Sequence, residues 1–178
     1  MPKTLLTDFN SERSIFLKGE VDDNTSSQVM LEATRLHSID PGALITMFVS
    51  SGGGNVGDAF ALYDYMMKVL KPNLQTVILG EASSSAVILF LMGKKRYVGE
   101  MALLKLHEFS FTPDRVSSIT ARRARKIARS LETPQAKYTT VVAQRSGMTE
   151  SKVRTLMRKE ATILPVQAVE LGLAHQIL

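Results

Sequence analysis

At the centre of the sequence lies a serine-rich stretch, Gly80-Glu81-Ala82-Ser83-Ser84-Ser85-Ala86. The apolar run 74–79 before it predicts a buried strand, and the run 87–92 after it predicts a buried helix. Three hydroxyl groups therefore lie at a strand-to-helix turn. Ser84 stands between two alanines, each two residues away, and such small neighbours permit a tight backbone bend.

This turn has two interpretations. Serine is a preferred N-cap residue, so the stretch can be an ordinary cap at the start of a helix. Alternatively, a tight bend exposes a nucleophilic serine, and the amides at the helix start favour negative charge beside it. The residues of the turn alone leave both interpretations open.

Predicted strands alternate with predicted helices on both sides of this turn. Upstream, the strand at 14–18 is followed by a helix that begins at a capping box of Thr25 and Gln28, and the strand at 43–49 by a helix at 57–70. This alternation indicates an α/β fold with right-handed crossovers and a mostly parallel sheet. Further strands are predicted at 96–98, 103–107, 162–164 and 173–178.

The composition indicates one domain spanning residues 1–178, in which residues 1–13 form a short N-terminal arm. Of the 178 residues, 44% are hydrophobic and 22% are charged, which is enough to bury a core. The chain has no cysteine, no apolar run long enough to span a bilayer and no secretory signal. We therefore expect a reducing, cytoplasmic location and no membrane contact.

The net charge of +5 is concentrated in the basic run 122–129. Long basic side chains readily stay in water, so we expect this run to be a solvated helix face, and nucleic acid is not an expected partner. An acidic partner or nucleic acid on this face stays open as the alternative, and its binding would weaken with salt.

Residues 114–159 are charged and helical in pattern, and we expect them to leave the compact domain as a helical handle. Thr133-Pro134 combines N-cap and N1 signals, and proline is unfavourable inside a helix, so a break or kink is predicted near Thr133. Tyr138, Val141 and Val142 need an apolar partner. We expect that partner to be another subunit.

The second candidate site is the glycine turn 50–57, which also follows a predicted strand. In parallel sheets ligands bind at the carboxyl ends of strands, where both turns lie. Gly52, Gly54 and Gly57 match the dinucleotide-binding pattern, with Glu81 placed as a ribose-binding acid. A plain tight turn and a backbone-amide cradle for an oxyanion are the alternatives. A P-loop is excluded because no Gly-Lys-Ser/Thr follows.

The chain offers three histidines as acid–base groups. His37 ends a predicted helix and is expected at the surface, and His175 lies in the terminal strand, where a packing or surface role is expected. His107 ends a predicted strand at the sheet edge that carries Ser84, which makes it a candidate general base as well as a candidate structural residue. No spacing of histidine or acidic residues suits a metal site.

Several stretches together resemble the proteolytic subunit of Clp protease. The serine turn 80–85 resembles the family's Gly-x-Ala-Ala-Ser-Met motif, and the glycine turn 50–56 resembles its Asn-Ser-Pro-Gly-Gly turn. The resemblance runs in order from about residue 12 to the end, which makes dinucleotide binding the weaker alternative. Other matching stretches are Arg13-Ser14-Ile15-Phe16-Leu17-Lys18-Gly19-Glu20-Val21-Asp22-Asp23, Ala61-Leu62-Tyr63-Asp64, Lys95-Arg96-Tyr97, Leu104-Lys105-Leu106-His107-Glu108 and Pro165–Leu178.

This resemblance implies a Clp protease/crotonase-like fold and a serine endopeptidase that cleaves unfolded polypeptides or peptides. Ser84 would be the nucleophile, His107 the general base and Glu160 the third member of the triad. The resemblance also assigns oxyanion binding to the backbone amides of Gly53 and Ser85, and substrate binding to Gly52, Gly54 and Asn55.

The resemblance further implies a homo-oligomer of two stacked heptameric rings that enclose a chamber. The handle 114–159 would interlock the rings. An AAA+ unfoldase would feed substrates in, and ATP would be used only by that partner. We therefore expect the chain itself to need no cofactor and no metal.

The sequence departs from the family pattern at several positions. The family's catalytic Asp is Glu160 here, which keeps the charge but adds a methylene, and its Pro in the glycine turn is Gly52. The Met after the nucleophile is Ser85, and residues 1–13 are shorter than the family segment that helps dock the unfoldase. A catalytically weak or silent ring subunit that modulates an active partner is therefore the alternative function.

Overall fold

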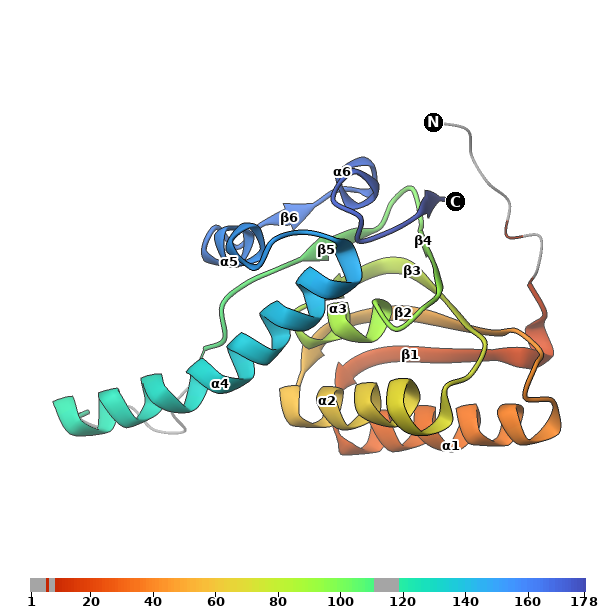
Figure 1. Ribbon diagram of the computed structural model, residues 1–178, viewed down its shortest axis with the longest axis horizontal. Helices are drawn as coiled ribbons and strands as arrows, with labels where there is room; N and C mark the ends of the chain where they lie inside the picture. Colours follow the sequence, from red (N-terminus) through yellow and green to blue (C-terminus); the bar gives the residue numbers. More distant parts are fainter. Residues whose placement is uncertain (1–5, 7–8, 111–118) are drawn as a thin grey trace.

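The structure is a computed structural model that describes residue 6, residues 9–110 and residues 119–178 (Figure 1). Its strands are β1 (Ser14–Val21), β2 (Ile45–Gly54), β3 (Leu74–Ser83), β4 (Lys95–Val98), β5 (Leu103–Lys105), β6 (Thr162–Ile163) and β7 (Gln176–Ile177). They form one sheet in the order β1-β2-β3-β4-β7, with β5 paired to β3 and β6 to β5. The described pairs are parallel except β5 with β6. The predicted α/β fold with a mostly parallel sheet is confirmed.

The helices flank this sheet, and one of them is wholly internal. They are η1 (Ser11–Arg13), α1 (Asp23–Ile39), α2 (Val56–Asp64), the π-helical η2 (Tyr65–Leu70), α3 (Ser85–Phe90), α4 (Ala121–Ser146), α5 (Glu150–Arg158) and α6 (Pro165–Glu170). Figure 1 shows α1 and α2 along one side of β1 and β2, and the N-terminal part of α4 projecting from the body. Every residue of α3 is buried, so the helix that follows the serine turn lies in the core.

Helix α1 begins earlier than the sequence predicts. Asp22 is its N-cap and accepts from the Thr25 amide at 2.8 Å, while the Asp22 amide donates to Thr25 Oγ1 at 2.9 Å. The Thr25 amide, and after it the Thr25 hydroxyl, which donates to Asp22 Oδ1 at 2.8 Å, lower the pKa of the exposed Asp22 carboxyl. Gln28 instead donates to Asn24 Oδ1, so the predicted capping box of Thr25 and Gln28 is wrong. Thr25 does belong to a capping box, but as the third residue of α1 rather than as the N-cap.

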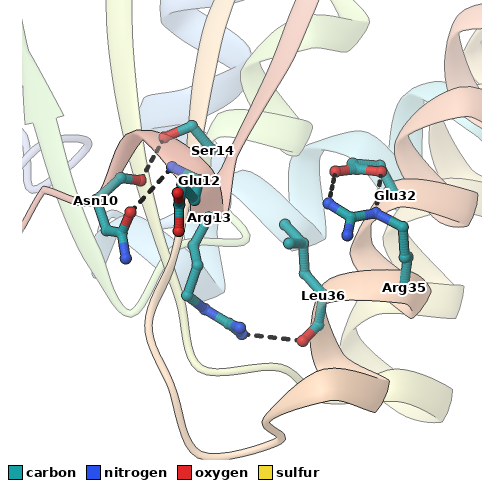
Figure 2. A network of polar contacts seen from close by, with 7 residues as sticks. All are labelled: Asn10, Glu12, Arg13, Ser14, Glu32, Arg35 and Leu36. Carbon is teal, nitrogen blue, oxygen red and sulfur yellow. Dashed lines mark hydrogen bonds and ion pairs between the residues drawn. The ribbon is translucent and has the colours of Figure 1, made fainter.

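Arg13 ties the start of β1 to the end of α1 (Figure 2). Its guanidinium donates to the carbonyl oxygens of Leu36 at 3.0 Å and Asp40 at 3.1 Å, and its Nε donates to that of Leu44 at 3.2 Å. The last carbonyls of a helix have no intrahelical donors, so a cation is favourable there. This contact fixes the crossover from α1 to β2.

Both central strands run further than their apolar segments. Strand β2 continues through the glycines to Gly54, and β3 continues to Ser83. Pairing persists there, with Ser51 opposite Ala82 and Gly53 opposite Glu20. Small residues still supply backbone hydrogen bonds, which an apolar pattern cannot reveal. The serine and glycine turns are therefore neighbouring strand ends.

Helix α4 runs without interruption from Ala121 to Ser146 with Pro134 inside it, so the break predicted near Thr133 is wrong, while the kink given as its alternative stays a prediction. Proline leaves the carbonyl four residues earlier, that of Ser130, without its helical donor. Ser130 is exposed, so water can satisfy that carbonyl, while the turns after Pro134 are held by packing.

The apolar residues of the handle find their partner within the chain. Tyr138 and Val142 are fully buried in the core, and Val141 packs against it half-buried. The prediction that these side chains need a second subunit is therefore wrong for the fold. The first part of the handle, 114–118, and most of the predicted N-terminal arm lie outside the described residues. No helix among the described residues is long and apolar enough to cross a membrane.

Candidate active site

The Ser84 backbone adopts a conformation that few non-glycine residues accept. Its φ is 54° and its ψ is −128°, at the junction between β3 and α3. Three hydrogen bonds hold it there. The Ser84 amide donates to the Lys105 carbonyl at 3.0 Å, and the Ser84 carbonyl accepts from the Tyr138 hydroxyl at 3.0 Å and the Val87 amide at 3.1 Å. Strain of this kind persists only where the surroundings over-determine it, and it is typical of functional sites.

The three hydroxyls of the turn have different environments. Ser83 Oγ donates to Glu81 Oε2 at 3.3 Å, and Ser85 Oγ donates to the Gly54 carbonyl at 3.3 Å. Ser84 occupies the N-cap position of α3, but its side chain makes no capping hydrogen bond. The interpretation of Ser84 as an ordinary N-cap is therefore not supported, and its hydroxyl is the one left for chemistry.

The glycine turn packs directly against the serine turn. A Cβ added at Gly53, whose φ is +94°, would lie 2.6 Å from Ser84 Cβ and 3.2 Å from the Ser85 amide nitrogen. Only glycine permits this approach. The Gly53 amide, predicted to bind an oxyanion, donates to Ser51 Oγ at 3.1 Å in this structure.

Ser84 and His107 line the same cavity, as the sequence predicts. The cavity has a volume of about 280 Å³. Its wall is mostly apolar, which is the kind of lining that receives a substrate side chain. The lining residues are Gly54, Val56, Ser84, His107, Phe109, Ser110, Leu131 and Pro134.

The imidazole of His107 is oriented by a backbone carbonyl. Its Nδ1 lies 2.7 Å from the carbonyl oxygen of Glu108. A carbonyl can only accept, so Nδ1 carries the proton, and in the neutral ring Nε2 is the acceptor. His107 therefore has the tautomer that a general base needs. Among the described residues, no hydrogen bond joins its ring to Ser84 or Glu160.

The carboxylate of Glu160 is engaged elsewhere. Glu160 follows α5 with a φ of +47°, and its Oε2 lies 3.7 Å from Lys105 Nζ. Its backbone is nonetheless beside β5, because the Leu106 amide donates to the Ala161 carbonyl at 3.1 Å. The ladder of β5 with β6 ends at Lys105 opposite Thr162, so Glu160 lies in the turn that leads into β6, on the side of the ladder where His107 follows β5. Glu160 and His107 both lie just beyond the end of that ladder, and no hydrogen bond joins them.

The predicted substrate residues lie at the carboxyl end of β2, with their polar groups partly used. Asn55 Oδ1 accepts from the amides of Gly57 at 2.8 Å and Asp58 at 3.3 Å, which caps α2. Those amides are the ones that would bind a pyrophosphate, so the cap weighs against the dinucleotide interpretation. A Cβ added at Gly52 would lie 3.6 Å from Glu81 Oε1.

The other two histidines lie outside the cavity. His175 Nδ1 accepts from the Arg96 amide at 3.1 Å, and burial, followed by the charges of Arg96 and Arg145, lowers the pKa of His175. His37 belongs to α1 and is half-buried. His175 is exposed and its ring binds the backbone of Arg96, which agrees with the packing or surface role expected for it, whereas His37 is less exposed than predicted.

Sequence reasoning missed two features of this site. The Tyr138 hydroxyl, which reaches Ser84 from α4, looked like part of an apolar stripe. Pro134 and Leu131 line the cavity, although proline here was interpreted as a helix breaker. No local pattern reveals such contacts, because they depend on how α4 crosses the serine turn.

Comparisons with known proteins agree with this architecture. The profile of the family described as Clp protease matches residues 3–178. ATP-dependent Clp protease proteolytic subunit 3 of Frankia casuarinae is 30% identical over 169 residues, covering 94% of this chain and 77% of that protein. Subunit 1 of Corynebacterium glutamicum is 30% identical over 170 residues, covering 93% and 79%. Subunit 2 of Streptomyces coelicolor is 32% identical over 173 residues, covering 94% and 76%.

Proposed function

The chain belongs to the Clp protease family, whose proteolytic subunits are serine endopeptidases, and we propose that it cleaves peptide bonds with Ser84 as the nucleophile. The cavity shared by Ser84 and His107 is the observation that carries this proposal. Ser84 stands there in a strained turn with an uncommitted hydroxyl, and His107 holds its proton on Nδ1.

The chemistry is acyl transfer in two halves. Ser84 Oγ attacks the carbonyl carbon of the scissile peptide while His107 Nε2 takes its proton, and the imidazolium then protonates the leaving amine. A water molecule, deprotonated by the same nitrogen, hydrolyses the acyl-enzyme. Substrate binding brings Ser84 and His107 into hydrogen-bond distance, which catalytic pairs often reach only in the complex.

Two backbone amides stabilise the negative charge of the tetrahedral intermediate. The Ser85 amide is among the first of α3, where amides have no intrahelical acceptor. The Gly53 amide is its neighbour across the contact between the two turns. Because Gly53 N–H bonds Ser51 Oγ in the free site, the Ser51 hydroxyl turns away as the oxyanion forms.

Glu160 serves as the third member of the triad after an exchange of partners. Its carboxylate leaves Lys105 and accepts from His107 Nδ1, which leaves the Glu108 carbonyl. The hydrogen bond from the Leu106 amide to the Ala161 carbonyl, which joins the residues next to His107 and Glu160, supports this role. A carboxylate there stabilises the imidazolium, whereas the neutral carbonyl of Glu108 only orients the ring.

The substrate is an extended segment of unfolded polypeptide or a short peptide. It binds along the end of β2, where Gly52, Gly54 and Asn55 offer backbone groups beside the site, in the manner of an added strand. Val56, with the other apolar lining residues, receives the side chain next to the scissile bond.

Clp proteolytic subunits in general self-assemble and act with an AAA+ partner. For this chain the finer proposal is two stacked heptameric rings, joined through the handle that includes α4 and enclosing the sites in a chamber. An unfoldase delivers polypeptides to that chamber, and ATP is used only by the unfoldase. The chain itself needs no cofactor or metal and acts in the cytoplasm.

Peptide hydrolysis by variants of the assembled protein tests the proposal. Ser84→Ala and His107→Ala are each expected to lower kcat about 10⁴-fold or more, because triad residues act as a unit. Ser83→Ala, which removes the adjacent hydroxyl, is the matched control and keeps most of the activity. Glu160→Ala is expected to hydrolyse peptide more slowly than Glu160→Asp.

Two outcomes contradict parts of this account. Full activity of both Glu160 variants removes Glu160 from the triad and leaves the Glu108 carbonyl as the only orienting group. Absence of hydrolysis by correctly assembled protein, on several unfolded substrates, favours the silent subunit that modulates an active partner.

A further inference from the structure

We propose that Tyr138 is a positioning residue that fixes the direction of the Ser85 amide, the oxyanion donor, through the carbonyl of Ser84. This inference rests on the proposed function, because it concerns how the same site stabilises its transition state. Tyr138 does not touch the substrate and acts through the backbone of the serine turn.

The contact joins a buried phenol to one particular peptide unit. Tyr138 lies in the packed half of α4 and has no exposed surface. Its hydroxyl donates to the Ser84 carbonyl oxygen at 3.0 Å, and its ring meets Phe109 edge-to-face, with centroids 5.4 Å apart. The only other donor to that carbonyl among the described residues is the Val87 amide at 3.1 Å.

The planarity of the peptide bond converts this contact into control of the oxyanion donor. The carbonyl of Ser84 and the amide of Ser85 belong to one rigid trans unit, so they point in opposite directions. Whatever fixes the carbonyl toward α4 therefore fixes the Ser85 N–H toward the opposite side, where Gly53 lies. A donor on the carbonyl also polarises the amide and strengthens the bond that its N–H makes.

Tyr138 is well suited to this role. Burial raises its pKa, so the phenol stays protonated and keeps donating. The ring is locked in the core, so the hydroxyl cannot turn to another acceptor without disturbing Phe109 and α4. The strained backbone of Ser84, with φ of 54°, needs such support, since only the Val87 amide would remain to hold its carbonyl.

The test compares Tyr138→Phe with the parent protein, with Tyr65→Phe as the matched control. Phenylalanine keeps the packing and the ring contact and removes only the hydroxyl. Tyr65→Phe also removes a hydroxyl bond, here a partly buried one to Thr34 Oγ1 between α1 and η2, and Tyr65 lies away from the cavity. We expect Tyr138→Phe to lower kcat about two- to tenfold, as loss of one neutral hydrogen bond predicts, with KM unchanged.

A peptide boronate separates positioning from general damage. Its adduct with Ser84 is tetrahedral and has an oxygen in the oxyanion hole, so Tyr138→Phe is expected to weaken boronate inhibition by the same factor as kcat. Affinity for the amine-side product peptide, which places no anionic oxygen in the oxyanion hole, should stay constant. Ring assembly, followed by sedimentation, should also match the parent.

The proposal is overturned if Tyr138→Phe turns over peptide and binds boronate as well as the parent does. It is also overturned if KM, product affinity and assembly change together with kcat, since that indicates a structural role alone. Failure of the proposed function is a different result, because the parent protein itself would then neither hydrolyse peptide nor bind boronate at Ser84.

Discussion

Backbone strain gathers at the residues that carry the proposed chemistry. Among the described non-glycine residues, positive φ occurs at Lys71, Ser84 and Glu160, and the last two are proposed catalytic residues. Such conformations cost of order 1–3 kcal/mol each and persist where contacts enforce them. The contact of Ser84 with Gly53 and the Lys105 partner of the Glu160 carboxylate are the features of these two residues that single substitutions can probe.

The first prediction at this scale concerns Gly53. In Gly53→Ala the new Cβ meets Ser84 Cβ and the Ser83 carbonyl, so the nucleophile must move, and a shift of about 1 Å lowers kcat about 10²-fold. Gly19→Ala is the matched control, because Gly19 has a similar φ of +87° but open space around its Cβ position. Peptide hydrolysis of both variants at a temperature where both remain folded provides the comparison.

Gly19→Ala should keep most of its kcat while losing stability, since a left-handed alanine costs about 1–2 kcal/mol. Equal loss of kcat in the two variants would mean that backbone strain, rather than the contact with Ser84, explains the effect.

The second prediction concerns Lys105. The lysine and Glu160 are both substantially exposed, so their ion pair is worth about 1 kcal/mol or less. Lys105→Met frees the carboxylate for His107 and is expected to raise kcat/KM by up to about fivefold. In the Glu160→Ala background the same change should have no effect, which a double-mutant cycle measures.

Lys152→Met, on the exposed side of α5, is the control for removing a positive charge. An equal gain from Lys105→Met with and without Glu160 would show that the lysine does not compete for this carboxylate.

At the scale of elements, α4 joins two functions. Its second half carries Tyr138 into the core beneath Ser84, while Pro134 and Leu131 form part of the cavity wall. Its first half is exposed and bears basic side chains, which is the solvated face predicted from the sequence. One helix therefore connects the proposed active site with the segment that projects from the body in Figure 1.

The third prediction concerns the proline inside this helix. Pro134→Ala restores an amide that can donate to the Ser130 carbonyl, and we expect it to raise the free energy of unfolding by about 1–2 kcal/mol. Pro165→Ala is the control, because Pro165 is at the start of α6, where its amide is not needed. Pro165→Ala should lower the free energy of unfolding by about 0.4–1 kcal/mol, because the unfolded chain gains conformational entropy when the proline is removed.

Urea unfolding at one protein concentration measures both variants. A loss of stability in Pro134→Ala would show that the proline is required where it stands, through its contact with the cavity.

The order of elements could be predicted because local periodicity carries it. Apolar runs between turn signals predict β1, β2 and β3, and the carboxyl ends of parallel strands meet at one edge, which brings Ser84 and His107 together. The extension of β2 through its glycines could not be predicted, since backbone pairing rather than an apolar pattern holds it. The continuity of α4 through Pro134 depends on packing of distant segments.

At the scale of the whole molecule, buried titratable groups link the fold to pH. Burial raises the pKa of Tyr138 above its ordinary value of 10.0, and burial lowers the pKa of Arg96 to about 10. Arg96 donates to the carbonyls of Leu173 and Gly172, so it joins the end of the chain to β4. Both groups titrate in alkali, and a variant that lacks the Tyr138 hydroxyl can separate their effects on the stability of the fold.

The fourth prediction is that Tyr138→Phe becomes less destabilising in alkali. Above pH 10 the unfolded parent chain loses the Tyr138 proton and the folded chain keeps it, so the unfolded state binds fewer protons and parent stability falls as pH rises. Phenylalanine removes this loss. The difference in free energy of unfolding between the parent and Tyr138→Phe should therefore shrink by up to about 1.4 kcal/mol per pH unit above pH 10.

Arg96 is present in both proteins, so its titration cancels in the comparison. Urea unfolding from pH 7 to pH 11 measures this difference, which should be constant below pH 9. Parallel stability curves across the whole range would contradict burial of a neutral phenol.

Family and fold could be predicted from the whole chain because several motifs occur in order. The side-chain partners within the site could not be predicted from the sequence. The bond of Gly53 with Ser51 and the pair of Glu160 with Lys105 depend on side-chain conformations, and motif spacing contains no information on them. Motif spacing identifies the residues of the proposed triad, but local competition decides which partners their side chains have in the free site.

The central claim is that Ser84 is a nucleophile activated by His107, and covalent labelling tests it most directly. The assembled protein is treated with a fluorophosphonate and mapped by peptide mass spectrometry. The account predicts one phosphonate per subunit, on Ser84, lost in Ser84→Ala and slowed about 10³-fold or more in His107→Ala. Labelling at another serine, or none in an assembled ring, would contradict it.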